Sequence, residues 1–129
     1  MIAFLDTDVL IECLRATTES KAWLAGTSRQ SFRIPGIAAM ELLMGCRDKR
    51  DLRQVQRFLD SFTVVWPNAS EPARAYRLLA RYCLTSGLSI PDCLIAAMAL
   101  SRRGRLYTFN AKDYGVLRQL DAREPYRRS

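Results

Sequence analysis

The chain opens with the stretch Ile2-Ala3-Phe4-Leu5-Asp6-Thr7-Asp8, in which four apolar residues lead directly into two acids. A short apolar run of this kind is typical of a buried strand in a parallel sheet, and it places Asp6 at the carboxyl end of that strand. Further short apolar runs follow, separated by segments of helix length. Strands that alternate with helices predict an α/β domain with a mostly parallel sheet.

Helical periodicity and turn residues place the other elements. Strands are predicted at residues 32–34, 62–66 and 105–109, and helices at 8–15, 21–25, 37–45, 47–61, 70–86 and 89–100. A short helical turn is predicted after Asn110, and the Arg-rich tail that follows shows no clear strand pattern. The body of the 89–100 helix is apolar almost throughout, which predicts burial. One face of the 70–86 helix is predicted to carry Ala73, Tyr76, Ala80 and Cys83.

The composition predicts one globular domain over residues 1–129. The 129 residues are 49% hydrophobic and 26% charged, and no repeat is visible. Histidine is absent, which excludes any mechanism that uses imidazole as base, acid or metal ligand. The four cysteines form no C-x-x-C pair, which excludes zinc ribbons and thioredoxin-like motifs.

The location of the protein is predicted from its N-terminus and its cysteines. The first residues lack a basic segment, and Asp6 and Asp8 interrupt the apolar run where a signal peptide would continue. No run approaches the roughly 20 apolar residues that a membrane span needs. We therefore expect a cytoplasmic protein with reduced thiols and no membrane partner.

Isolated acids in apolar segments are the main functional signal. Glu41 is the only charged residue between Arg33 and Arg47, and Asp92 is the only one between Arg81 and Arg102. A buried carboxylate without compensation costs several kcal/mol, or its pKa shifts until it is neutral. A shared divalent cation would compensate several such acids at once.

Chain topology predicts that these acids meet. The carboxyl ends of parallel strands share one edge of the sheet, where ligands usually bind. Asp6 follows the first strand, Asn110 and Asp113 follow the last clear strand, Asp92 lies at a helix start, and Glu41 lies early in a helix. We predict that Asp6, Glu41, Asp92 and Asp113 converge in one pocket. Four carboxylates without His or paired Cys suit Mg²⁺ or Mn²⁺ rather than zinc.

Each acid except Asp6 also has a purely structural explanation of comparable weight. An acid can cap a helix, and Ser or Asn followed by Asp three residues later can form a capping box. The matching positions are Asp8 as an N-cap, Ser89 with Asp92, and Asn110 with Asp113. Glu41 has no capping role, but a buried Arg partner would equally explain it.

The basic charge favours a polyanionic partner. Twenty Lys and Arg face thirteen Asp and Glu, which gives a net charge of +7, and seventeen of the twenty are Arg. Such a surface attracts nucleic acid in a salt-sensitive way, although arginines repeated along one helix face are mostly solvated. The helical sets are Arg47, Arg50, Arg53 and Arg57, and Arg74, Arg77 and Arg81.

Four ordered motifs carry a family resemblance. They are FLDTDVLIE (4–12), AAMELLMG (38–45), PDCLIAAMALSRRG (91–104) and LYTFNAKDY (106–114). Together they resemble the PIN-domain family, and within it the VapC-type toxins of bacterial toxin–antitoxin pairs. The resemblance implies a three-layer α/β/α sandwich that is usually a homodimer. It also implies a Mg²⁺- or Mn²⁺-dependent endoribonuclease that acts on RNA and is inhibited by a cognate antitoxin.

The resemblance also assigns site residues. Asp6, Glu41 and Asp92 match the three best-defined acids of the family. For the fourth, many members carry an acid at the position of Asn110, and others have Asn there and an acid near Asp113; this chain has the second arrangement. Asp8 and Thr108 match polar positions that shape the site. The antitoxin is expected to lay apolar side chains along a groove near the first helices and to insert an Arg or Lys towards the acids.

Three other classes of protein share part of this sequence pattern. A receiver domain needs a phospho-accepting Asp after the third strand, where this chain has Trp66-Pro67-Asn68. A haloacid-dehalogenase-like phosphatase needs a hydroxyl where Leu10 stands. A catalytically silent PIN-like module that binds RNA or a protein partner is the alternative interpretation; loss of a site acid would mark it, whereas here the acids are present.

Overall fold

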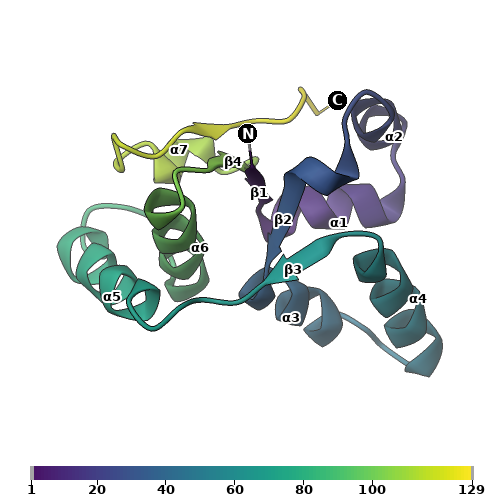
Figure 1. Cartoon of the computed structure of the whole chain (residues 1–129), viewed down its shortest axis with the longest axis horizontal. Helices are drawn as coiled ribbons and strands as arrows, with labels where there is room; N and C mark the ends of the chain where they lie inside the picture. The colour runs from purple at the N-terminus through teal and green to yellow at the C-terminus, as the bar shows by residue number, and fades with distance from the viewer. Residues whose placement is uncertain (1, 129) are drawn as a thin grey trace.

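The structure is a computed structural model that describes residues 2–128 and folds them into one α/β unit (Figure 1). None of its helices in this range is long and apolar enough to span a membrane. The elements are β1 (Ala3–Leu5), α1 (Thr7–Arg15), α2 (Thr18–Ala25), a 3₁₀ turn (Arg29–Ser31), β2 (Phe32–Pro35), α3 (Gly36–Met44), α4 (Lys49–Asp60), β3 (Thr63–Val65), α5 (Glu71–Tyr82), α6 (Ile90–Ser101), β4 (Arg105–Tyr107), α7 (Ala111–Tyr114) and β5 (Ala122–Arg123).

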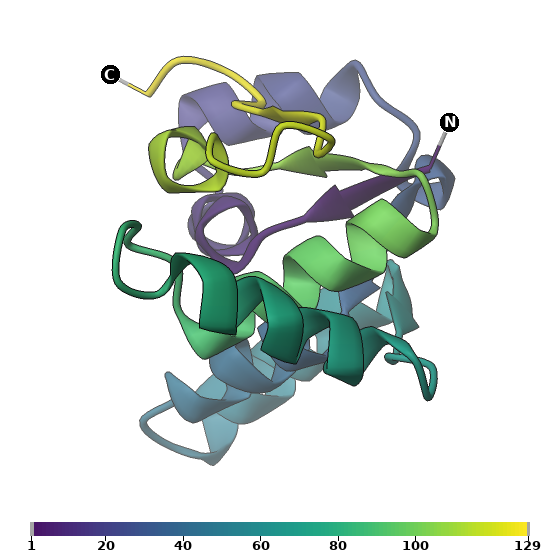
Figure 2. The same cartoon turned by 90° about the vertical axis from the view of Figure 1, so that its left-hand side faces the viewer.

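The strands form one sheet in the order β3-β2-β1-β4-β5, and all neighbours are parallel. The chain runs in one direction along the sheet from β1 to β3 and then crosses back to β4. Because crossovers between parallel strands keep one hand, this reversal places α5 and α6 on the opposite face from α1 to α4. Figure 1 shows α1, α2 and α4 on one side, and Figure 2 brings the α5 and α6 side to the front. The predicted three-layer α/β/α sandwich is confirmed.

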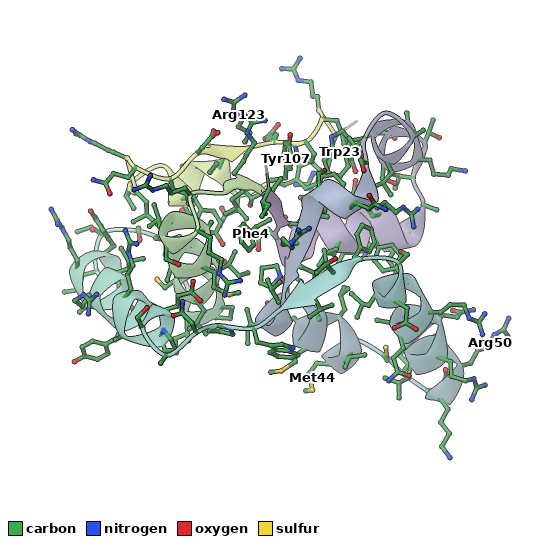
Figure 3. The ribbon with its side chains drawn as sticks, viewed as in Figure 1. Phe4, Trp23, Met44, Arg50, Tyr107 and Arg123 are labelled. Atoms are coloured by element: carbon green, nitrogen blue, oxygen red, sulfur yellow. The ribbon has the colours of Figure 1, made fainter. Side chains whose placement is uncertain are left out.

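The core lies on both faces of the sheet. Phe4, Leu5, Ile34 and Leu106 are fully buried in the central strands, and Figure 3 shows Phe4 in the middle of the molecule. The α6 residues from Cys93 to Ala99 are buried apart from Leu94, as the apolar pattern predicts. Three alanines in that stretch keep the helix narrow, so that it packs closely on the sheet and on α5.

The structure differs from the sequence-based expectations at the end of α5 and in the C-terminal tail. Helix α5 ends at Tyr82 rather than at residue 86. The predicted face with Ala73 and Tyr76 points to solvent, with Tyr76 74% exposed. The buried residues of α5 are Glu71 and Ala75, so its inward face starts with an acid that an apolar pattern cannot reveal. The chain after α7 does form a strand, β5, but two residues are too short for a period-two signal.

A buried ion pair joins both helices of the second face to the end of β3. Glu71 is 1% exposed, and its carboxylate accepts hydrogen bonds from Arg102 Nη2 at 2.9 Å and Arg102 Nε at 3.0 Å. Ser101 Oγ and the Asn68 N–H also donate to it, and Arg102 Nη2 donates to the Trp66 carbonyl at 2.8 Å. The Arg102 guanidinium holds the pKa of Glu71 down at about 2.

We predict that Glu71→Gln lowers the free energy of unfolding by about 2–3 kcal/mol near neutral pH, because it removes one charge of a buried pair. The folded-state pKa of Glu71 lies below its usual value of 4.5. The stabilisation is therefore complete above that value and is lost as the pH falls towards about 2. Urea unfolding followed by circular dichroism should show a gap between wild type and variant that closes in acid. Glu124→Gln, at an exposed position, is the matched control; equal stabilities of wild type and Glu71→Gln at neutral pH would contradict the prediction.

Candidate functional site

The candidate site lies at the carboxyl ends of β1 and β4. Asp6 directly follows β1, and Thr108 directly follows β4. These two strands are neighbours, and the chain leaves them towards opposite edges of the sheet. Such a switch point opens a crevice above the sheet and is the usual ligand site of open α/β folds.

Hydrogen bonds hold the Asp6 side chain in place at this switch point. Its side chain is 5% exposed, and its Oδ2 accepts a hydrogen bond of 2.7 Å from the Thr108 hydroxyl. Its Oδ1 accepts a bond of 2.9 Å from the Thr7 N–H and so caps α1. The Asn110 N–H donates to Thr108 Oγ1 at 2.9 Å, which fixes the orienting hydroxyl in turn. The carboxylate is therefore positioned before any ligand arrives.

Asp8 lies beside Asp6 but does not cap the helix, so its predicted role as N-cap is wrong. It is in the first turn of α1, where its Oδ2 accepts a hydrogen bond of 3.1 Å from the Phe109 N–H. Its Oδ1 is buried and has no hydrogen-bond partner among residues 2–128. A buried acceptor without a partner is costly and marks a place where a ligand can bind.

Asp92 reaches the same crevice from the start of α6. The predicted capping box is confirmed, because Asp92 Oδ2 accepts from the Ser89 N–H at 2.9 Å and Ser89 Oγ accepts from the Asp92 N–H. Its Oδ1 accepts a hydrogen bond of 3.1 Å from the hydroxyl of Tyr114. Capping and site placement are thus combined in one residue.

Tyr114 is a site residue that the sequence analysis missed. It is fully buried in α7, and its hydroxyl lies in the field of Asp6 and Asp92. Burial first, and then those two charges, raise the pKa of Tyr114 well above its usual value of 10, so it remains a neutral donor. An aromatic residue at the end of a short helix is most simply interpreted as core, so only its place in the fourth motif hinted at this role.

The site is a cluster of carboxylates without a direct ion-pair partner in the described part of the chain. Burial, followed by the charge of Asp8, raises the pKa of Asp6 to about 7, and Asp92 adds to this. Burial likewise raises the pKa of Asp8. No salt bridge to any of the three acids forms within residues 2–128. A positive ligand would relieve both the desolvation and the repulsion.

Glu41 lies at the rim rather than in the interior. It is exposed on α3, which corrects the assumption that its apolar neighbours bury it, and no Arg pairs with it in the described part of the chain. Its Oε1 accepts a hydrogen bond of 2.8 Å from the Thr7 hydroxyl, next to Asp6. Glu41 is therefore linked to the site through the first residue of α1.

Asp113 is the least connected of the four predicted acids. It packs against the loop before α6, where a Cβ placed on Gly87 would lie 2.6 Å from Asp113 Oδ2. The predicted capping box of Asn110 with Asp113 is wrong, because the Asn110 side chain makes no capping bond. Asp113 precedes Tyr114, whose hydroxyl donates to Asp92.

The donor set fits a hard divalent cation, although the acids are not assembled into a ready-made cage. Within residues 2–128 no three His, Cys, Asp or Glu side chains already stand in metal-binding geometry. The available donors are nevertheless carboxylate oxygens, one of them the unpartnered Oδ1 of Asp8. Oxygen donors with net negative charge favour Mg²⁺ or Mn²⁺ over softer metals.

The C-terminal segment packs against the site from the α1 and α2 side. The Tyr126 ring lies 5.3 Å from the Phe109 ring, and its hydroxyl donates to Glu12 Oε1 at 3.2 Å. Arg128 Cζ lies 4.2 Å from the centre of the Phe109 ring. Its charge lowers the pKa of Asp8 in part, but burial outweighs this effect.

A separate groove of about 480 Å³ lies between α1, α3 and α4. Its apolar lining includes Ile11, Leu14, Leu42 and Val55, and Glu41 stands at its edge. The ion pair of exposed Arg47 with half-buried Asp51 also lines it. The groove therefore leads from an apolar surface to one acid of the site.

Comparison with known proteins identifies the family. A sequence model of the PIN domain matches residues 3–119. Ribonuclease VapC10 of Mycobacterium tuberculosis is 31% identical over 117 residues, which cover 89% of this chain and 87% of that protein. A chain in a toxin-antitoxin complex from Klebsiella pneumoniae is 26% identical, with a TM-score of 0.80 and coverage of 98% and 99%. A chain of VapBC2 from Rickettsia felis, solved with a DNA fragment from the promoter, has the same fold, with a TM-score of 0.81, 20% identity and coverage of 96% and 98%. The matched span, the curated relative and the shared fold agree, and the chain belongs to the PIN-domain family.

Proposed function

We propose that the chain is a Mg²⁺-dependent endoribonuclease, active also with Mn²⁺, and the toxin of a toxin–antitoxin pair. The observation that carries the proposal is the cluster of Asp6, Asp8 and Asp92 at the β1–β4 switch point, where none of the three forms a salt bridge within residues 2–128. The ribonuclease relative supports the reaction, and the similar chain in a toxin-antitoxin complex supports the biological role.

Asp6, Glu41, Asp92 and Asp113 are the proposed metal ligands. The charge of Asp92 already raises the pKa of Asp6. Glu41 is held by a single surface hydrogen bond from Thr7, so its side chain can turn towards the other acids at a small cost in free energy. Asp113 is preferred to Asn110 as the fourth ligand because it carries a charge, and the Asn110 backbone already orients Thr108. One or two ions would be compatible with this set.

The chemistry follows from the ligands. When bound, a divalent cation lowers the pKa of a coordinated water and offsets the charge that develops on the phosphodiester. The chain's own residues hold the ligands still: Thr108 orients Asp6, and Tyr114 orients Asp92. Such supporting hydrogen bonds commonly contribute 10–100-fold to metal affinity or activity.

The groove between α1, α3 and α4 is the proposed antitoxin site. Its apolar lining suits a helical or extended segment with alternate apolar side chains. Glu41 lines this groove and would attract an Arg or Lys of the antitoxin towards the acidic cluster. Such a cation would replace the charge of the metal, so that inhibitor and metal compete.

The proposed homodimer uses the outer face of α3. Met40 and Met44 are 45% and 86% exposed, and Figure 3 shows Met44 at the edge of the molecule. Trp66 packs on Gly36 beside them and is 58% exposed. Clustered large apolar side chains of this kind mark protein interfaces.

Sedimentation equilibrium of the purified chain tests the dimer; a monomer at all concentrations would exclude it.

We predict that the purified protein cleaves RNA with Mg²⁺ or Mn²⁺ and is inactive in EDTA. Asp6→Asn and Asp92→Asn should each lower the cleavage rate at least about 100-fold, because each removes a ligand charge. Tyr114→Phe should cost about tenfold, and excess Mn²⁺ should recover part of the loss if the hydroxyl acts by orienting Asp92. Gel analysis of total RNA with and without metal provides the measurement.

Asp60→Asn, an exposed acid on α4, is the matched control and should leave the rate unchanged. Cleavage that persists in EDTA would contradict the metal mechanism. A folded protein that binds RNA but never cleaves it would instead establish the catalytically silent module.

We also predict that Mn²⁺ weakens inhibition by the cognate antitoxin. If the antitoxin inserts a cation among Asp6, Glu41 and Asp92, metal and inhibitor occupy the same charge site and must compete. Titration of Mn²⁺ against the complex should raise the antitoxin concentration needed for half inhibition. The effect should shrink for an antitoxin whose inserted Arg or Lys is replaced by Ala. An inhibition curve that Mn²⁺ leaves unmoved would show that the antitoxin acts elsewhere.

A further inference from the structure

A second groove, distinct from the apolar groove described above, lies on the other face of the sheet. A cavity of about 880 Å³ opens between α5, the end of α6 and the chain from α7 to residue 119. A smaller one of about 340 Å³ continues it towards β4 and shares with it Arg74, Leu100 and Gln119. Figure 2 shows these elements on the side turned to the viewer. The two cavities adjoin at these shared residues and are together called the α5–α7 groove.

The α5–α7 groove is strongly basic. Its cationic lining residues are Arg74, Arg81, Arg103, Arg105, Lys112 and Arg118. Its only acidic lining residue is Asp121, which is already paired with Arg105 at 3.0 Å and Arg123 at 2.8 Å. Arg74, Arg81 and Arg118 make no salt bridge within the described residues 2–128. Unpaired arginines along a channel bind a chain of phosphates well.

The groove also offers an aromatic surface. Tyr82 lines it, with Arg81 Cζ 5.4 Å from the centre of the Tyr82 ring. Apolar side chains of Leu78, Val116 and Leu117 lie beside them. Basic channels with an aromatic ring are typical of single-stranded nucleic-acid sites, where the ring stacks on a base and the arginines contact phosphates.

Helix α7 connects the groove to the acidic site. Tyr114 points from α7 into the site and donates to Asp92, whereas Lys112, two residues earlier, lines the groove. Helix α7 therefore contributes one side chain to the groove and another to the acidic site. An RNA strand bound at the acids would pass α7 to enter the α5–α7 groove.

We propose that the α5–α7 groove binds the backbone of single-stranded RNA on one side of the scissile bond. The inference deepens the proposed ribonuclease function and rests on it for the identity of the ligand. Phosphates would contact Arg74, Arg81 and Arg118, and a base would stack on Tyr82. In this proposal the groove binds the RNA backbone, and the acidic site cleaves the phosphodiester bond.

The test compares two triple variants with equal charge change. Arg74→Gln, Arg81→Gln and Arg118→Gln together neutralise the groove. Arg50→Gln, Arg53→Gln and Arg57→Gln together neutralise three exposed arginines of α4, and Figure 3 shows Arg50 projecting away from the molecule on the other side. Binding of a fluorescein-labelled single-stranded RNA of about ten nucleotides is measured by anisotropy in EDTA over a series of KCl concentrations.

The groove triple variant should bind RNA at least about tenfold more weakly, and the slope of log affinity against log salt should fall by about 2, since each phosphate contact contributes roughly 0.7. The α4 triple variant should change affinity less than about twofold. Replacing the three groove arginines by Lys should restore most of the binding, and Tyr82→Ala should weaken it without changing the slope. Equal losses in the two triple variants, or no loss in the groove variant, would overturn the proposal.

A second arm separates RNA from an acidic protein partner. Poly-L-glutamate should displace the RNA only weakly, and equal displacement would show that the groove takes acidic polypeptides instead. Because binding is measured without metal, the two proposals can fail independently. Groove-dependent binding by a protein that never cleaves RNA would refute only the nuclease, and cleavage that is unaffected by the groove variant would refute only the groove.

Discussion

The hydrogen bond from the Thr108 hydroxyl to Asp6 joins residues 102 positions apart and holds the carboxyl ends of β4 and β1 together. It forms because the chain crosses back from β3 and inserts β4 beside β1, which makes these strands the switch point of the sheet. Helix α1 starts at this point and brings Asp8, and α6 arrives with Asp92. The acidic site is thus a consequence of strand order, with each carboxylate supplied by a different element.

Two buried acids show how differently this chain treats negative charge. Glu71 receives a guanidinium and other donors, and its pKa is held at about 2. Asp6 is nearly as buried, receives only neutral donors, and has Asp8 and Asp92 nearby, so that its pKa rises to about 7. The first arrangement stabilises the fold. The second weakens it unless a cation binds, which is the usual sign of a functional site.

The outline of this design could be predicted from sequence, because its signals are local. The run ending at Asp6 and the Ser89–Asp92 capping box are confirmed, as is the buried α6. Burial could not be predicted from apolar neighbours alone: Glu41 occupies the exposed side of an apolar helix. The burial of Glu71 could not be predicted either, because it depends on an ion pair with Arg102, which is 31 residues away in the sequence. Tyr114 and β5 acquire their roles only through tertiary contacts.

The central claim is that Asp6 belongs to a cation site rather than to the scaffold. Thermal unfolding of wild type and Asp6→Asn, in EDTA and with Mn²⁺, tests it most directly. In EDTA, at a pH above the raised Asp6 pKa of about 7, the variant should melt several degrees higher, because it removes an ionised group that is buried among like charges. Added Mn²⁺ should raise the melting temperature of wild type but not that of the variant. A lower melting temperature of the variant in EDTA, together with a wild-type melting temperature that Mn²⁺ does not change, would show that Asp6 only caps a helix.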